Sequence, residues 1–183
     1  GAQADQDTVV NLTNHAYFNL SGHGAGSLDD QKVCIFADSF TENDENCLPT
    51  GKILPVAGSP MDFRDWHYIT ERISAEDIQL KNGNGYDHNW IIRGDGFRKC
   101  AEAVSDSTGI AMEVWTDQPG MQFYTANYLT PARKGKDSAD YHPRGAFCFE
   151  TQGFPNGTAF AHFPSPVLRK EEVYERKTLY RLR

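Results

Sequence analysis

The sequence predicts an all-β fold, a large antiparallel β-sandwich, and three observations carry this prediction. Short alternating or apolar runs recur along the whole chain, nine prolines and 16 glycines separate them, and only one stretch has the signals of a helix. A parallel α/β sheet needs a helix in each crossover, so many short strands joined by turns indicate antiparallel sheets. The 183 residues contain no repeat and no linker, and we expect one domain, residues 1–183.

The expected elements can be placed in order along the chain. Period-two alternation predicts a first strand over residues 8–15, with Val10, Leu12 and Asn14 on one side. The same criteria predict strands over residues 32–36, 88–92, 101–104, 110–116, 121–128, 145–152 and 173–182. The single predicted helix runs from Ser74 to about Leu80, because Ser74 can cap it and Asp77 follows in its first turn.

Composition excludes several classes of protein. The 25 acidic and 18 basic residues give a net charge of −7, which disfavours nucleic acid as a partner. No apolar run approaches the ~20 residues that cross a bilayer, so we expect no membrane partner. The four cysteines are widely spaced without a C-x-x-C pair, which predicts free thiols in a reducing compartment, the cytoplasm, with secretion as the alternative. No metal or cofactor motif is present in the sequence, and we expect none of these groups.

The strongest polar anomaly lies in residues 146–152, Ala-Phe-Cys-Phe-Glu-Thr-Gln. Alternation places Phe147 and Phe149 on one side of the strand and Cys148, Glu150 and Gln152 on the other. A carboxylate between phenylalanines indicates a cavity, where desolvation would raise its pKa toward that of a general base. A solvent-facing edge strand explains the local pattern about equally well.

Three further segments combine polar and aromatic residues in the same way. His15 lies among amides and aromatic rings in residues 14–22, Asp87 precedes a histidine in residues 85–90, and Gln122 lies in residues 119–124. A lone histidine is more often structural. Ring faces together with directional hydrogen-bonding groups are, however, what a sugar site requires. Four such segments in a sandwich without a nucleotide motif indicate a neutral carbohydrate ligand.

The segment TNHAYFNLSG, residues 13–22, closely resembles the signature of the aldose 1-epimerases (galactose mutarotases). Four more blocks follow in the order of that family: LPTG at 48–51, GYDH at 85–88, QPGMQFYTAN at 118–127 and FETQ at 149–152. The resemblance covers essentially the whole chain but only the carboxy-terminal part of such an enzyme. It implies a galactose mutarotase-like β-sandwich that here lacks its amino-terminal part, with residues 1–183 as the carboxy-terminal portion of a single domain.

The resemblance also implies a reaction and its residues. Enzymes of this family interconvert the α and β anomers of free hexoses such as glucose and galactose, with a glutamate as general base and a histidine as general acid. No metal or redox cofactor is needed for this chemistry. Carried over position by position, the family pattern predicts Glu150 and His15 as catalytic residues and Asp87, Gln122, Asn14 and Tyr17 as substrate-binding residues.

One part of the family pattern has no match in this sequence. The family also uses an arginine and a second histidine from its amino-terminal half, and neither Arg64 nor His67 lies in a corresponding motif. We therefore expect either a companion chain that carries this half or a proteolytic cut in a longer enzyme. We further expect the strands around Phe123, Phe147 and Phe149 to lack a cover, and the chain alone to be poorly soluble or inactive.

Two other functions stay open on the sequence. A non-catalytic sugar-binding or regulatory module would use the same cleft without turnover, and a retaining glycosidase would use Asp87 and Glu150. The presence of both His15 and Glu150 favours the enzyme over the binding module, because a binder needs neither an acid nor a base.

Overall fold

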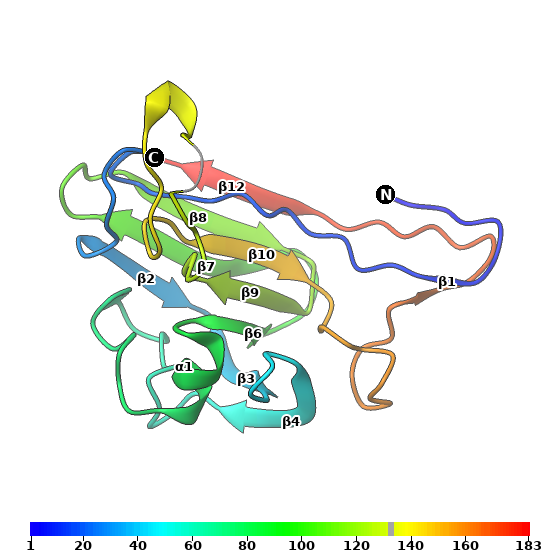
Figure 1. The fold of residues 1–183 in the computed structure, drawn as a ribbon. Helices are drawn as coiled ribbons and strands as arrows, with labels where there is room; N and C mark the ends of the chain where they lie inside the picture. The colour runs from blue at the N-terminus through cyan, green and yellow to red at the C-terminus, as the bar shows by residue number, and fades with distance from the viewer. Residues whose placement is uncertain (132–133) are drawn as a thin grey trace.

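The computed structural model describes residues 1–131 and 134–183, and most of its strands belong to two five-stranded antiparallel sheets (Figure 1). The first sheet has the strand order β10-β9-β6-β3-β4, and the second has the order β12-β8-β7-β2-β5. The first sheet consists of β3 (Ala37–Asn43), β4 (Pro49–Pro55), β6 (Asp87–Ile92), β9 (Gly120–Tyr124) and β10 (Cys148–Gln152). The second consists of β2 (Gln31–Ile35), β5 (His67–Tyr68), β7 (Arg98–Ser105), β8 (Ala111–Thr116) and β12 (Thr178–Leu182). The prediction of an all-β antiparallel fold is confirmed.

The hydrophobic core lies between the two sheets. Phe123, Phe147 and Phe149 are fully buried and belong to one cluster with apolar residues of the second sheet. The sulfur atoms of Cys100 in β7 and Met121 in β9 approach to 3.8 Å across the core. The expectation that these phenylalanines lack a cover is therefore wrong, because the second sheet of the same chain covers them.

The amino-terminal segment differs from the expected strand over residues 8–15. Only β1 (Thr8–Val9) forms a ladder, with β11 (Val167–Leu168), and the side chains of Val9 and Leu12 are more than half exposed. Figure 1 shows this segment running out from the sheets beside the chain that leads into β12, and Ala2 forms a bridge with Tyr174 there. Alternation in this segment thus reflects extended backbone without a buried face.

The helix also begins later than the sequence predicts. Helix α1 spans Ile78–Gly83 and Asp77, not Ser74, is its N-cap. The Asp77 carboxylate accepts hydrogen bonds from the backbone N–H groups of Gln79 (2.8 Å) and Leu80 (3.4 Å), which satisfies two donors of the first turn. The helix ends at Asn84, whose φ of 52° is left-handed and stops the helical repeat.

Two further expectations can be compared with the structure. All four cysteines are free, and Cys34, Cys100 and Cys148 are buried while Cys47 is partly exposed, which confirms the predicted thiols. Within the described ranges, the helices are too short and too polar to cross a bilayer. A single 3₁₀ turn at Lys136–Ser138 completes the secondary structure described for this chain.

Candidate active site

The polar groups of the site stand in cross-strand rows on one face of the first sheet. The register of β10, β9 and β6 places Glu150 beside Gln122 and Gln122 beside Asn89. The neighbouring row consists of Cys148, Tyr124 and Asp87. Because alternate residues of a strand share a face, both rows lie on the surface opposite the phenylalanines of the core. The orientation predicted for residues 146–152 is confirmed.

A cleft of about 370 Å³ opens above these rows, within the range of ~300–1,000 Å³ that small-molecule sites occupy. Its lining residues are His15, Tyr17, Asp87, Gln122, Tyr124, Glu150, Gln152 and Pro155. The cleft thus brings together every site residue predicted from the sequence except Asn14. The described lining residues include no lysine or arginine, so the cleft offers aromatic, amide and carboxylate groups and suits a polar ligand without negative charge.

Glu150 is a buried acid at the cleft. Only 7% of the residue is exposed, and none of the described residues donates a hydrogen bond to its carboxylate. Its Oε1 lies 3.7 Å from Nε2 of His15. Burial raises the pKa of Glu150 above its usual value, the His15 imidazole opposes this rise, and the charge of Asp87 adds to it. The arrangement holds a base with free lone pairs beside a possible proton donor.

His15 is oriented by aromatic rings. Its imidazole stacks on Tyr17 with 5.1 Å between ring centroids and meets Tyr124 edge-on at 6.2 Å. The backbone of this segment is fixed where Phe18 and Phe147 exchange two hydrogen bonds, of 2.7 and 2.9 Å. Burial raises the pKa of Tyr17 to about 12, so its hydroxyl keeps its proton at neutral pH.

A chain of amides connects the rest of the cleft floor. Gln122 donates from Nε2 to Oδ1 of Asp87 (2.8 Å), and Gln152 donates to Oε1 of Gln122 (3.0 Å) and to Oδ1 of Asn89 (3.3 Å). Gly120 leaves the space for this packing, because a Cβ at that position would overlap the amide of Asn89. Burial raises the pKa of Asp87, and the hydrogen bond from Gln122 and the His15 charge oppose it.

Two residues from the predicted segments lie outside the cleft. Asn14 accepts a hydrogen bond from the backbone N–H of Ala16 (3.0 Å) and lines a separate hollow of about 190 Å³; its position supports a role in shaping the loop. His88 is fully buried and packs edge-on against Phe40 and Trp90. Burial lowers the pKa of His88 to about 4, so it is a neutral residue of the core.

The structure adds three residues to the predicted site. Tyr124 and Gln152 line the cleft, and Asn89 lies below them with its Nδ2 buried and unpartnered among the described residues. Each stands two residues beyond a predicted one: Gln122, Glu150 and Asp87 respectively. Since strand residues at this spacing share a face, alternation alone could have identified all three.

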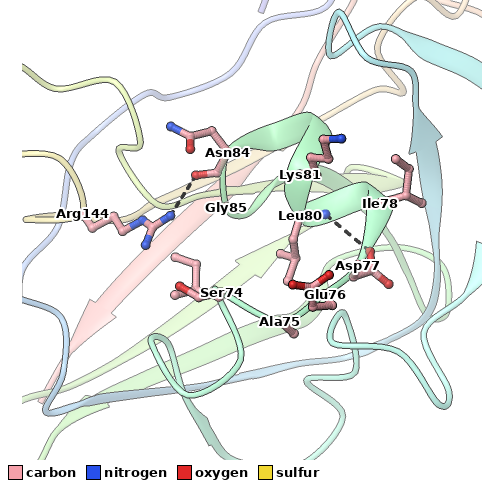
Figure 2. A pocket seen from close by; sticks show the side chains of 11 residues that line it. Ser74, Ala75, Glu76, Asp77, Ile78, Leu80, Lys81, Asn84, Gly85 and Arg144 are labelled. Atoms are coloured by element: carbon pink, nitrogen blue, oxygen red, sulfur yellow. Dashed lines mark hydrogen bonds between the residues drawn. The ribbon is translucent and has the colours of Figure 1, made fainter.

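A second hollow, of about 460 Å³, lies at the start of α1 (Figure 2). Two of its charged residues serve the local structure. Asp77 caps the helix, and Arg144 donates to the backbone carbonyl of Asn84 at 3.2 Å, as Figure 2 shows. No histidine lines this hollow, and the structure describes no ion pair among its lining residues, whereas the cleft pairs His15 with Glu150; the candidate active site is therefore the cleft around Glu150.

Comparison with known proteins gives a consistent result. The family model described as aldose 1-epimerase matches residues 1–181. The chain is 41% identical to a galactose mutarotase of Sus scrofa over 98% of its own length and 51% of that protein, and 34% identical to an aldose 1-epimerase of Escherichia coli K12 over 98% and 52%. A crystal structure of a GalM/aldose epimerase homologue from C. elegans superposes with a TM-score of 0.84 at 25% identity, covering 99% of this chain and 53% of that one. The chain therefore spans about half the length of the curated relatives it matches, and it belongs to the aldose 1-epimerase family.

Proposed function

We propose that this chain carries the acid–base pair of a mutarotase, which interconverts the α and β anomers of a free hexose such as glucose or galactose. The observation that carries the proposal is the approach of His15 and Glu150 to 3.7 Å at a cleft lined by polar and aromatic groups. The names of the relatives, galactose mutarotase and aldose 1-epimerase, support the same reaction.

The proposed reaction consists of two proton transfers. The Glu150 carboxylate takes the proton of the C1 hydroxyl, and the freed electron pair forms the carbonyl bond while the bond from C1 to the ring oxygen breaks. The ring oxygen takes a proton from the His15 imidazolium. After rotation about the C1–C2 bond, the same steps in reverse close the ring on the other face and restore both residues.

The remaining cleft residues have proposed roles in binding. Asp87 and Gln122 form a joined acceptor and donor pair suited to neighbouring sugar hydroxyls. The rings of Tyr17 and Tyr124, 6.3 Å apart and nearly perpendicular, offer apolar surface for the carbon face of the sugar. The companion segment with an arginine and a second histidine remains part of this proposal, and so does the reducing compartment, which the four free thiols support.

The test compares Glu150→Gln with a matched control, Glu102→Gln, in the other sheet, where the carboxylate is paired with Lys99 (2.8 Å). Anomer exchange of galactose and glucose is followed by polarimetry, and sugar binding by calorimetry. We expect Glu150→Gln to lose ~10²–10⁴-fold in rate and to keep binding, because the amide preserves shape but takes no proton.

The outcomes separate the candidate functions. One outcome is a wild-type chain that binds sugar without accelerating anomer exchange. If adding the companion segment then restores the rate, the enzyme needs that segment; if it does not, the result favours the binding module. An active wild type with a fully active Glu150→Gln variant would overturn the assignment of the base.

A further inference from the structure

A buried thiol that the proposed reaction does not use lies next to two residues that line the cleft, His15 and Glu150. Cys148 is fully buried and stands two residues before Glu150 on the same face of β10. Its Sγ, a ring nitrogen of His15 and a carboxylate oxygen of Glu150 all lie within 4.8 Å of one another. Within the described part of the chain, no hydrogen bond engages the sulfur.

These distances fit a tetrahedral metal ion. Zn²⁺ binds thiolate at about 2.3 Å and imidazole or carboxylate at about 2.0–2.2 Å, which places tetrahedral ligand atoms about 3.3–3.7 Å apart. The His15 and Glu150 atoms stand 3.7 Å apart, and the sulfur, within 4.8 Å of both, has to approach them by at most about 1 Å on metal binding. Because His15 and Glu150 line the open cleft, water from the cleft can take the fourth position.

The choice of ligands and the local charge select the kind of ion. Sulfur and imidazole ligands favour zinc and similar thiophilic cations over magnesium or calcium, which take oxygen ligands. Asp87 and Glu150 already make this part of the cleft acidic, and no lysine or arginine is among its described lining residues. A divalent cation would therefore add positive charge to that of His15 beside these two acids.

We propose that His15, Cys148 and Glu150 form a binding site for a divalent thiophilic cation, with Zn²⁺ as its probe, and that the bound ion closes the cleft to sugar. On binding, the thiol releases its proton to solvent, and so does the ligating nitrogen of His15 where the imidazole is protonated; the metal bonds to sulfur, nitrogen and oxygen then form with no change of oxidation state. Cation binding does not depend on the proposed reaction. If that reaction holds, the ion also occupies the lone pairs of its acid and its base, and inhibition is competitive with sugar.

The experiment titrates the metal-free 183-residue chain with Co²⁺ and then with Zn²⁺. We expect Co²⁺ to give the intense visible bands of tetrahedral coordination together with a thiolate-to-cobalt charge-transfer band in the near ultraviolet. Zn²⁺ should displace the cobalt and abolish both signals. The ring protons of His15 should show paramagnetic shifts with Co²⁺, which locates the ion in the cleft.

Cys148→Ser tests the ligand directly. It should abolish the charge-transfer band and weaken Zn²⁺ binding by more than about 100-fold, since even changes to the partners of metal ligands cost ~10–100-fold. Cys34→Ser is the matched control, because Cys34 is a buried thiol of the other sheet that donates to the Arg64 carbonyl, and it should bind like wild type.

Three results would overturn the proposal: a wild-type chain without the charge-transfer band, unshifted His15 signals, or equal Zn²⁺ affinity in the folded Cys148→Ser variant. If Cys148→Ser does not fold, Cys148→Ala replaces it. If neither folds, the wild-type spectra decide alone, because the band requires a thiolate and the shifts require His15. None of these outcomes depends on anomer exchange, so the proposed function is judged separately.

Discussion

Gln152 connects the two sides of the cleft floor, and its replacement by leucine tests whether this connection stabilises the site. The side chain is 8% exposed and donates to Gln122 (3.0 Å) and to Asn89 (3.3 Å). Leucine is close in size, so packing is largely kept and the change isolates the two hydrogen bonds.

The expected loss follows from these two bonds. Each hydrogen bond contributes about 0.5–1.5 kcal/mol net, so Gln152→Leu should lower the free energy of unfolding by about 1–3 kcal/mol. The substitution also leaves the buried acceptor oxygens of Gln122 and Asn89 without this donor. We therefore expect the loss in the free energy of unfolding to lie at the upper end of this range. Gln122 also loses the contact that turns its Nε2 toward Asp87, so we expect weaker sugar binding in addition.

Urea unfolding measures the effect, with an unchanged slope required for comparison. Gln6→Leu is the control, because Gln6 is an exposed residue and should stay within about 0.5 kcal/mol of wild type. Equal stability of Gln152→Leu and the control would refute the reasoning and show that the amide chain contributes nothing net.

The remaining predictions concern charge and capping. Burial raises the pKa of Glu150, so the folded state holds this proton more tightly than the unfolded state, and stability falls as pH rises through the folded pKa. Glu150→Gln should therefore be more stable than wild type at pH 7 and equal to it below about pH 4, as unfolding at several pH values will show. In the pH profile of kcat/KM, activity should fall on the acid side as Glu150 becomes protonated, because the active base is unprotonated. The midpoint of this fall should lie above the ordinary glutamate pKa of 4.5, and a midpoint at or below 4.5 counts against Glu150 as the base. Asp77→Ala should cost about 1 kcal/mol in thermal unfolding, whereas Ser74→Ala should cost little.

The sequence predicts which face of a strand a side chain lies on better than it predicts which strands pair with each other. The positions of Phe147, Phe149 and Glu150 follow from alternation, because side chains of any strand alternate between two faces. The pairing of residues 8–15 does not follow from alternation, since an extended segment has the same pattern whether or not a neighbour buries it. Strands β3 and β4 were not predicted from the sequence. The alternating pattern is weak there, because β3 carries the charged residues Asp38 and Glu42 and β4 begins and ends with proline.

The site residues show the same division. Five residues named by the resemblance line one cleft, because each belongs to a motif that the fold brings together: Glu150, His15, Asp87, Gln122 and Tyr17. Asn14 lies outside this cleft, and its side chain accepts a hydrogen bond within its own turn. The approach of Cys148 to His15 was beyond sequence reasoning, because it joins two distant segments through a register that local spacing does not encode.

The attachment of the His15 segment has a consequence for the dynamics of the site. Glu150 belongs to the five-residue ladder of β10 with β9. The described chain around His15 is instead joined by the bridge between Phe18 and Phe147, by stacked rings and by side-chain hydrogen bonds such as those of Asn11 and Asn19. Regions held by few contacts open at a lower free energy than the global transition. Amide hydrogen exchange should then show that the segment around His15 and the strand of Glu150 open in different cooperative units. The His15 imidazole can therefore move away from the Glu150 carboxylate while both sheets remain folded.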